Sequence, residues 1–355
     1  EAIDYTGPDR DVAHDLPGTE IKIGLILPLT GGRKAEGDAL LAAAQMALED
    51  EALTPFSNGL RLKLSTRDEN GLWGRASSEI VKLVVDDRAI ALVTSSDGRA
   101  AHLAEQVGNR LGVPVLSLAS DSQNTQINIP WYFRMTPDDA AQARLFAADI
   151  YRRRSLQRLV VVFESDHDGK VGREEFNKAA RRLHTTEPAS VEIATPSGEL
   201  AAVIARINEH HPQAIVLWAS AVPAARMVEE LRQTRSTAEI YVCHKALQEP
   251  FISAASKTGT PQIWAAAASV ANSLPSRDNF DYRFHARFGV PTNPAAREMY
   301  DAIRLIAECV RTVGPNRARL RDSLAKIGKY QGVSGWISFA GAGNTQAACV
   351  LATLK

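Results

Sequence analysis

The chain has 355 residues, 45% of them hydrophobic, which is enough to bury more than one core and favours two domains over one. Lys plus Arg and Asp plus Glu balance at 41 each, so the chain lacks the basic excess that binds nucleic acid or anionic membranes. The longest apolar runs, such as 159–163 and 264–271, are far shorter than the roughly 18–20 residues that span a bilayer. We therefore expect neither nucleic-acid binding nor direct membrane insertion.

Predicted strands and helices alternate along most of the chain. Residues 1–20 have scattered apolar positions with Pro and Gly, which predicts an arm that lies on a surface. Predicted strands then lie at 21–29, 60–68, 90–95, 113–119, 158–164, 191–196, 214–220, 239–244, 261–269, 335–341 and 348–354. Predicted helices lie at 37–52, 75–87, 100–111, 136–154, 172–184, 199–210, 223–235, 297–314 and 317–328. This alternation predicts two α/β units with parallel sheets and right-handed crossovers.

Small and polar residues recur where the predicted strands end. The segments TGGRKAEGD (30–38), RDENGLWG (67–74), TSSDG (94–98) and LASDS (118–122) follow strands of the first half, and ESDHDG (164–169), WASAV (218–222) and CHKAL (243–247) follow strands of the second half. In open parallel sheets, ligands bind beyond the carboxyl ends of the strands. Ser hydroxyls, Asp carboxylates and helix N–H groups there predict a site for a small polar molecule. The alternative is that Ser and Asp only cap the following helices.

Three cysteines, Cys243, Cys309 and Cys349, lie far apart and are odd in number. Their spacing indicates neither a disulfide framework nor a CxxC metal site. We expect them to be small buried hydrophobic residues, with a Cys309–Cys349 bridge as the alternative, and we expect no cofactor or metal.

Several segments together resemble the leucine/isoleucine/valine-binding type of periplasmic solute receptor, the class I periplasmic binding protein fold. The resemblance runs from about Ile21 to the C-terminus. It is carried by IKIGLILPLTG with GDALLAAAQMALE, by GVPVLSLAS followed by WYFRMTPDDAAQA, by LVVVFESDHDG and by YQGVSGWISF. It implies two Rossmann-like lobes with parallel-rich sheets, joined by a three-segment hinge, which hold a solute as they close.

The resemblance also implies domain boundaries and ligand contacts. Residues 1–20 would form an N-terminal arm, 21–137 plus 250–330 lobe 1, and 138–249 plus 331–355 lobe 2. The expected first-lobe contacts are Ser96, Asp97, Ala119, Ser120 and Asp121. The expected second-lobe contacts are His167, Asp168, Ser220 and Lys245.

Some of these positions depart from the family pattern. Glu36 and Asp168 stand where family members have tyrosines that cover the ligand, and Trp73 is a candidate to replace a lost aromatic wall, with a packing role as the alternative. Lys245 stands where the family has an acidic residue that receives the ligand's ammonium. A cation there favours an anion or a carbonyl, whereas Asp121 shifts the charge the other way. Branched-chain amino acid specificity is therefore not carried over.

The resemblance predicts a non-enzymatic receptor that captures an amino acid or a related small polar molecule for an ABC importer. It implies a monomer in the periplasm or another extracytoplasmic space, after removal of a signal peptide and with any tether in the removed N-terminal segment. One alternative is a ligand-sensing ectodomain of the same fold. The other is a metal-dependent hydrolase centred on Asp166, His167 and Asp168, although the sequence has no HExxH, P-loop or nucleophile-elbow motif.

Overall fold

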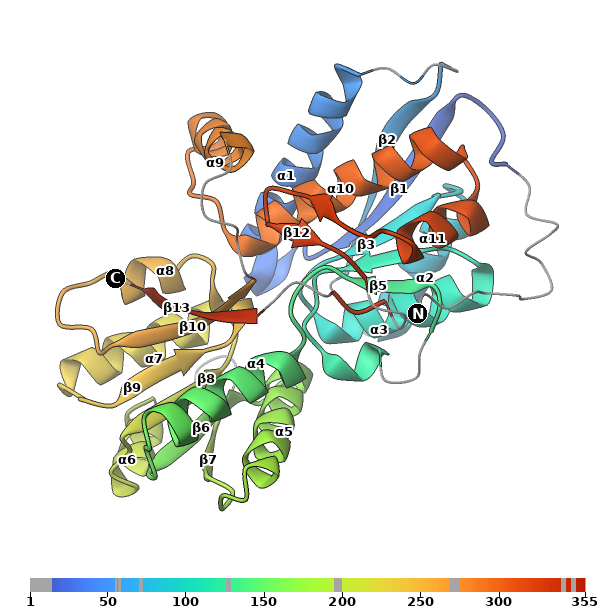
Figure 1. Cartoon of the computed structure of the whole chain (residues 1–355). Helices are drawn as coiled ribbons and strands as arrows, with labels where there is room; N and C mark the ends of the chain where they lie inside the picture. Colours follow the sequence, from blue (N-terminus) through green and yellow to red (C-terminus); the bar gives the residue numbers. More distant parts are fainter. Residues whose placement is uncertain are drawn as a thin grey trace. The chain divides into compact units, whose positions relative to one another are not determined.

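The computed structural model describes residues 15–54, 56, 59–69, 73–125, 129–194, 200–268, 275–339, 343–345 and 349–354. These residues form two compact units, each with its own sheet (Figure 1). Unit 1 holds the described residues up to Ala119, those of Gln123–Thr136 and those from 275 to 345. Unit 2 holds Ser120–Ser122 and the described residues of 137–268 and 349–354.

Unit 1 is built on a five-stranded parallel sheet in the order β2-β1-β3-β4-β5. Its strands are β1 (Glu20–Leu27), β2 (Arg61–Asp68), β3 (Ala91–Thr94), β4 (Val115–Ser117) and β5 (Tyr132–Arg134). A separate antiparallel pair, β11 (Tyr330–Gln331) and β12 (Trp336–Ile337), also belongs to this unit. The order reverses at β1, because β2 pairs on one side of it and all later strands of the sheet lie on the other.

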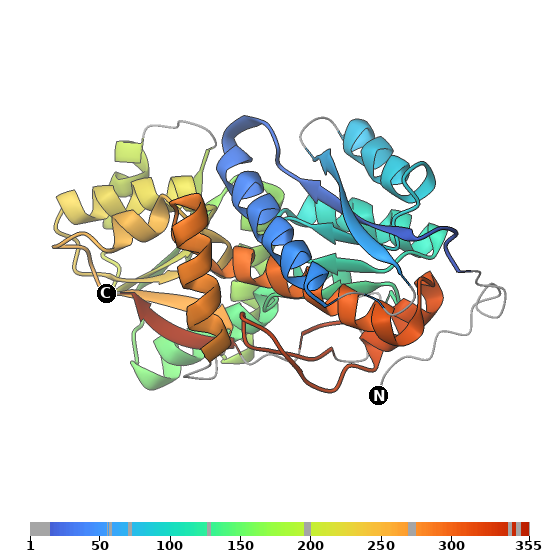
Figure 2. The same cartoon turned by 90° about the horizontal axis from the view of Figure 1, so that it is seen from above.

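Helices cover both faces of this sheet. They are α1 (Lys34–Ala52), α2 (Trp73–Val85), α3 (Gly98–Leu111), α9 (Pro275–Phe288), α10 (Pro294–Val313) and α11 (Arg317–Ala325). Ile23 and Leu25 of β1 face a core shared with α1, α10 and α11, whereas Ile26 faces a second core shared with α2 and α3. Side chains of a strand alternate between faces, so β1 is buried on both. Figure 2 shows α1 and α10 packed along each other.

Unit 2 repeats the arrangement, with one added strand. Its sheet has the order β13-β10-β9-β8-β6-β7, and all neighbours are parallel except the antiparallel pair β10–β13. The strands are β6 (Leu159–Glu164), β7 (Ala189–Ile193), β8 (Ala214–Trp218), β9 (Glu239–Val242), β10 (Ile263–Ala268) and β13 (Cys349–Leu354). Here the order reverses at β6, between β7 and β8.

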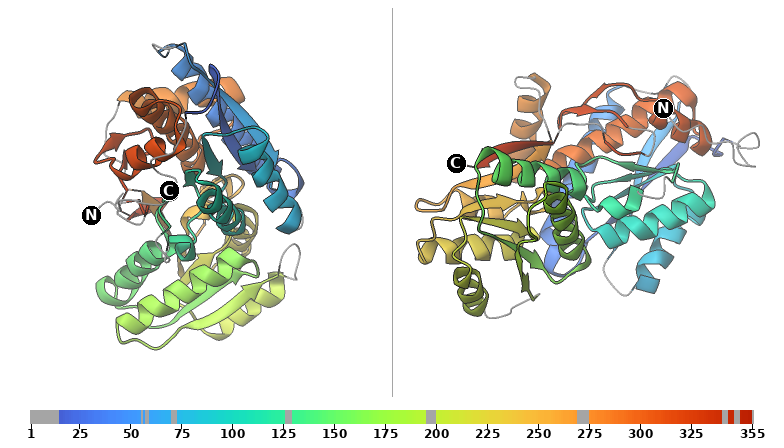
Figure 3. Two further views of the ribbon diagram at one scale, coloured as in Figure 1. Left: turned by 90° about the vertical axis from the view of Figure 1, so that its right-hand side faces the viewer. Right: turned by 60° about the horizontal axis from the view of Figure 1, so that its bottom comes forward.

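The helices of unit 2 are α4 (Asp139–Ala147), which continues into a π-helical turn (Ala148–Arg153), α5 (His167–Arg182), α6 (Leu200–Glu209), α7 (Ala221–Gln233) and α8 (Phe251–Ala255). The helices α4 and α5 pack against each other (Figure 3), and α7 packs against α6 and α8. Right-handed crossovers place helices on opposite faces when the strand order reverses. Both faces of this sheet are therefore covered.

The division into units differs from the predicted one at Ser120–Ser122, at Pro137 and in two longer segments. Residues 250–268 lie in unit 2 rather than lobe 1, because β10 pairs with β9, with Ile263 opposite Ile240. The described residues of 331–345 lie in unit 1 rather than lobe 2. They are held there by Asp301, whose carboxylate accepts hydrogen bonds from the backbone N–H groups of Val333 (2.8 Å) and Ser334 (2.7 Å). The greater part of the predicted N-terminal arm, residues 1–14, lies outside the described residues.

A glycine at an equivalent place in each unit allows the helix that follows the first strand to approach that strand. A Cβ atom on Gly37 of α1 would lie 2.1 Å from the carbonyl oxygen of Pro28, just after β1, and one on Gly169 of α5 would lie 2.2 Å from that of Glu164, at the end of β6. Backbone atoms cannot yield as a flexible side chain can. Both glycines therefore fix how the helix N-terminus sits beside the strand end.

We expect Gly169→Ala to lower the free energy of unfolding by about 1–3 kcal/mol or more, because the added methyl group must displace the Glu164 backbone. Chemical denaturation measures this change. The matched control is Gly328→Ala, where nothing lies within 4 Å of the new Cβ. Equal stability of the two variants would contradict the close approach.

Candidate functional site

In unit 1, polar side chains gather where the strand order reverses. Arg33 and Glu36 follow β1, Glu69 follows β2, and Ser96 and Asp97 follow β3. These three strands are neighbours and parallel. Their carboxyl ends therefore bring the five residues to one edge of the sheet, the place where open parallel sheets bind ligands.

The guanidinium of Arg33 is the centre of this cluster. It donates to Glu36 (2.8 and 3.0 Å), to Glu69 (2.8 Å) and to Asp97 (2.9 Å). The hydroxyl of Ser96 donates to Glu36 (2.5 Å), and the hydroxyl of Ser95 donates to Glu69 (2.6 Å). The Arg33 guanidinium thus binds three carboxylates, and the hydroxyls of Ser95 and Ser96 donate hydrogen bonds to two of them.

This crowding of carboxylates changes their protonation. Burial, together with the nearby charges of Asp97 and Glu36, raises the pKa of Glu69 to about 8 although Arg33 opposes the shift. Burial alone would lower the pKa of Arg33, but the carboxylates of Glu36, Glu69 and Asp97 raise it above its ordinary value. Arg33 is therefore a permanent cation, and Glu69 holds a proton near neutral pH.

Asp97 has a second role as the N-cap of α3. Its carboxylate accepts hydrogen bonds from the backbone N–H groups of Arg99 (2.9 Å) and Ala100 (3.2 Å). The Arg99 guanidinium lies 3.2 Å from the same carboxylate. The capping alternative thus holds for this residue, which also takes part in the cluster.

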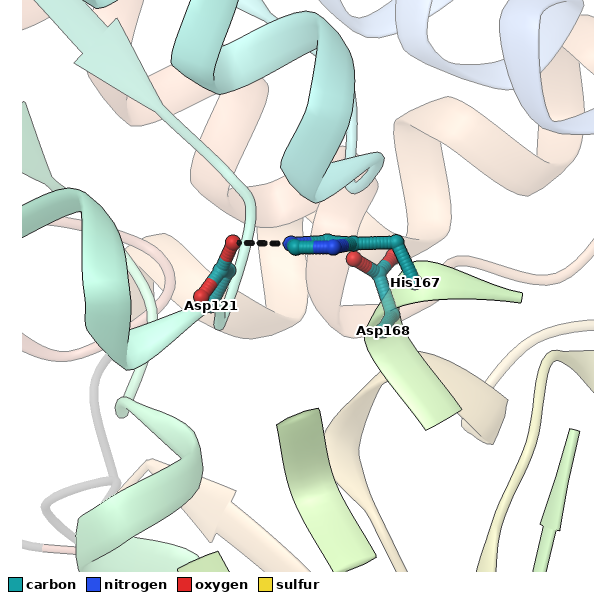
Figure 4. A group of neighbouring side chains, drawn as sticks. All are labelled: Asp121, His167 and Asp168. Atoms are coloured by element: carbon teal, nitrogen blue, oxygen red, sulfur yellow. Dashed lines mark hydrogen bonds and ion pairs between the residues drawn. The ribbon is translucent and has the colours of Figure 1, made fainter. Parts of the chain in front are cut away.

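In unit 2, a second cluster lies at the N-terminus of α5, beside the reversal at β6. Asp166 caps this helix by accepting a hydrogen bond from the backbone N–H of Gly169 (2.8 Å). Nε2 of His167 lies 2.7 Å from the carboxylate of Asp121, and Figure 4 shows this contact with Asp168 beside the imidazole. The structure therefore assigns Ser120 and Asp121, expected in the first lobe, to unit 2.

Lys245 is buried against two carboxylates of this cluster. Its ammonium forms an ion pair with Asp168 and lies 3.6 Å from Asp166. The sequence-based prediction set the charge of Lys245 against that of Asp121 and did not include Asp166 and Asp168 as its partners. In the structure that charge is already balanced by carboxylates, so it gives no net attraction for an anion.

Asp139, the first residue of α4, lies fully buried behind this cluster. Its Oδ1 accepts a hydrogen bond from the Trp218 indole (3.2 Å), and its backbone N–H donates to the Ser120 carbonyl (2.8 Å). Its Oδ2 has no hydrogen-bond partner among the described residues. Burial raises the pKa of Asp139 to about 7, with further contributions from the charges of Asp168 and Asp121.

Side chains nearly fill the space at this edge of unit 2. Ser220, the N-cap of α7, donates to Glu164 from both its hydroxyl (2.7 Å) and its backbone N–H (2.9 Å). A cavity bounded by Glu164, Trp218, Ser220 and Lys245, among others, has a volume of about 10 Å³, which is room for about one water molecule. A solute of this unit would therefore lie over these side chains rather than inside the cavity.

Asp121, His167 and Asp168 could together ligate a metal ion, since their ligand atoms lie within 4.8 Å of one another. Lys245, however, already forms an ion pair with Asp168. A positive charge against one of three ligands weakens the attraction for a second cation of high charge density. The donor set is thus a poor one for a divalent ion.

The remaining predicted residues are Ala119, Trp73 and the three cysteines. Ala119 is buried, and its carbonyl accepts from Arg134 (3.2 Å) while its N–H donates to Ser117 (3.1 Å). Trp73 is the first residue of α2, and a contact of its side chain with solute stays a prediction. All three cysteines are free, with Cys243 and Cys309 buried.

Sequence reasoning missed Arg33, Glu69 and Asp139 as members of these clusters. Arg33 and Glu69 lie in TGGRKAEGD (30–38) and RDENGLWG (67–74), two of the predicted strand-end segments, but neither residue was singled out as a contact. Asp139 was predicted only to stabilise the N-terminus of a helix. The residues around it in the sequence do not indicate that its side chain is buried.

Comparison with known proteins identifies the family. A family model described as periplasmic binding protein matches residues 20–354, and the chain belongs to this family. The family consists of solute-binding proteins rather than enzymes, and it implies a location outside the cytoplasm. None of the helices in the described part of the chain has the length and hydropathy needed to cross a bilayer.

Solved structures show the same fold at low sequence identity. The leucine-binding protein LivK of Thermotoga maritima is 19% identical and superposes with a TM-score of 0.82, over 93% of this chain and 94% of LivK. A solute-binding protein of an ABC transporter from R. palustris, solved with benzoate, is 18% identical with a TM-score of 0.83, over 95% and 93% of the two chains. The predicted class I periplasmic binding protein fold is thus confirmed.

A curated relative matches a shorter stretch. Over 132 residues, 37% of this chain, the sequence is 24% identical to Glutamate receptor 2.5 of Arabidopsis thaliana. The match spans 14% of that receptor.

We expect Lys245→Met to lower the free energy of unfolding by about 3–5 kcal/mol, because it leaves two carboxylates without their buried cation. The matched control is Lys257→Met, which removes an exposed partner of Glu229 and should cost less than about 1 kcal/mol. Chemical denaturation of both variants measures the difference. Similar small losses in both would show that Lys245 carries no buried charge pair.

We expect Glu69→Gln to be more stable relative to the wild type at pH 8 than at pH 5. The raised pKa means that folded Glu69 keeps a proton which the unfolded chain has lost, so its contribution to stability falls as pH rises between about 5 and 8. The difference in unfolding free energy between variant and wild type should change by about 3–4 kcal/mol over this range. Glu209→Gln, on an exposed position of α6, should follow the wild-type pH dependence. Parallel curves for Glu69→Gln and the wild type would contradict the raised pKa.

Proposed function

We propose that this protein is an extracytoplasmic receptor that captures a small polar solute and delivers it to an ABC importer, without catalysing a reaction. Family membership supports solute binding. Similar structures include substrate-binding proteins of ABC transporters, among them one from Streptococcus pneumoniae solved with isoleucine, 20% identical over 92% of this chain and 93% of that one, with a TM-score of 0.80. At such identity the likeness concerns the fold, so neither isoleucine nor benzoate is carried over as the solute.

The observation that carries the proposal is that each unit gathers its charged and hydroxyl side chains at the reversal of its strand order. We propose that the solute is bound by residues of these clusters. In unit 1 the proposed contacts are Glu36, Trp73, Ser96, Asp97 and Ala119. In unit 2 they are Ser120, Asp121, His167, Asp168, Ser220 and Lys245.

The similarity to part of a plant glutamate receptor supports a second candidate, a sensing module of the same fold. The two candidates differ in what happens to the solute. Uptake of labelled solute by cells that lack the gene separates them: loss of high-affinity uptake supports the import role, and unchanged uptake with a lost transcriptional or behavioural response supports sensing.

We expect Ser96→Ala and Asp121→Asn each to reduce solute-induced thermal stabilisation by at least a few degrees. A ligand at 100 times its Kd stabilises the folded state by about 2.7 kcal/mol, so the loss of one contact in either unit is measurable. Differential scanning fluorimetry over amino acids, organic acids, amides, amines and sugars identifies the solute first. Lys257→Met is the control variant. Wild-type shifts in both site variants would overturn the proposed location of the site.

A further inference from the structure

Basic side chains collect at one edge of the sheet of unit 2, at the strand ends that lie away from its charged cluster. The strands β6, β7, β8, β9 and β10 run parallel, so the segments that lead from each helix to the next of these strands lie along the same edge. We define the basic edge as these segments, each from the last four residues of a helix to the residue before the following strand. They are 150–158, 179–188, 206–213, 230–238 and 252–262.

The basic edge carries a local excess of positive charge. It contains ten Lys and Arg residues against three Asp and Glu residues. Segments of the same kind in unit 1, which are 49–60, 82–90 and 108–114, contain three against five. The helix dipole favours cations at helix C-termini, but it acts in both units and does not explain this difference. The balance of 41 to 41 over the whole chain hides the excess.

Hydrogen bonds and ion pairs hold several of these segments side by side. The backbone N–H of Gln213 donates to the carbonyl of Arg158 (2.7 Å), and Nε of Arg158 donates to the carbonyl of His211 (2.9 Å). The Arg154 guanidinium lies 2.9 Å from Glu239, the first residue of β9. The segments that precede β6, β8 and β9 therefore form one continuous surface.

Part of the positive charge is not balanced within the described part of the chain. Carboxylates form ion pairs with some cations of the edge, namely Arg153, Arg154, Arg181 and Lys257. Four other cations are exposed and form no ion pair with any residue that the structure describes, namely Arg152, Arg158, Arg182 and Arg235. These four guanidinium groups are available to an anionic partner.

The character of the surface indicates which anionic partner it fits. All residues of the basic edge are described, and the exposed large apolar side chains of the described chain lie elsewhere. Interfaces between proteins have an apolar core that is rich in aromatic residues, so the basic edge is a poor protein interface. Arg binds phosphate oxygens well through its planar guanidinium. The family implies a location outside the cytoplasm, where lipid phosphates are a more accessible partner than nucleic acid.

We infer that the basic edge binds the surface of an anionic phospholipid bilayer, without insertion of the chain into the hydrocarbon core. Each cation near such a surface adds to the attraction, which falls off within a Debye length. The contact uses none of the residues proposed to bind the solute. It is therefore tested independently of the solute's identity.

The experiment is co-sedimentation of the full chain with large unilamellar vesicles. One set of vesicles contains phosphatidylcholine alone, and the other contains phosphatidylcholine mixed with phosphatidylglycerol. We expect the protein to bind only the vesicles with phosphatidylglycerol. Raising NaCl from about 0.01 M to about 1 M should release it, because the Debye length falls from about 30 Å to about 3 Å.

A triple variant connects binding to the basic edge. Arg152→Gln, Arg182→Gln and Arg235→Gln together should lower the partition coefficient for the vesicles with phosphatidylglycerol by at least about tenfold. The control variant combines three exposed positions of unit 1, namely Arg88→Gln, Arg110→Gln and Lys326→Gln.

The two triple variants are closely matched. Arg88 and Arg235 both have a left-handed backbone, with φ of 55° and 54°, and Arg110 and Arg182 both lie in the last turn of a helix. Each variant removes three positive charges near helix C-termini, so both should lose a similar small amount of stability. The control should bind the vesicles as the wild type does, and circular dichroism with a melting curve confirms that both variants are folded.

Three results would overturn the inference. The first is absence of co-sedimentation with phosphatidylglycerol at low salt, or equal binding to both sets of vesicles. The second is an equal loss of binding in both triple variants, which would mean that net charge rather than the basic edge attracts the protein. The third is binding to heparin but not to the vesicles, which would assign the basic edge to a different polyanion.

Discussion

The reversal of strand order next to β1 and next to β6 is the constraint on which the rest of the molecule depends. At each reversal, neighbouring parallel strands send their following segments to opposite faces of the sheet, so the carboxyl edge between them stays open for side chains. Gly37 and Gly169 let the helices that follow β1 and β6 start close beside this edge. The charged clusters of both units follow from this geometry.

Ion pairs and buried carboxyl groups occupy the carboxyl edge of each sheet. Arg33 in unit 1 and Lys245 in unit 2 each hold several carboxylates together that would otherwise repel one another. Burial raises the pKa of Glu69 to about 8 and that of Asp139 to about 7, so both carboxyl groups hold protons near neutral pH. The N-termini of α3 and α5 are occupied by the protein's own aspartates.

Local pattern predicted the apolar strands and missed several other elements, among them β5 and α9. The strands β1 and β6 are nearly continuous apolar runs, and both were predicted. The strand β5 has only three residues, and its place depends on pairing with β4, where Phe133 lies opposite Leu116. The helix α9 was missed although Phe280, Phe284 and Phe288 recur at a spacing of four residues, a signal that could have revealed it.

The sequence by itself determined the fold class, the alternation of strands and helices, and the presence of polar residues at strand ends, because hydrophobic periodicity and turn residues are local properties. Only the tertiary structure decided which of these residues meet. Arg33 contacts Glu69 and Asp97, which lie 36 and 64 residues further along the chain, and the charge of Lys245 is balanced by Asp168, 77 residues before it. Such pairings depend on strand order and register, which no short window of sequence contains.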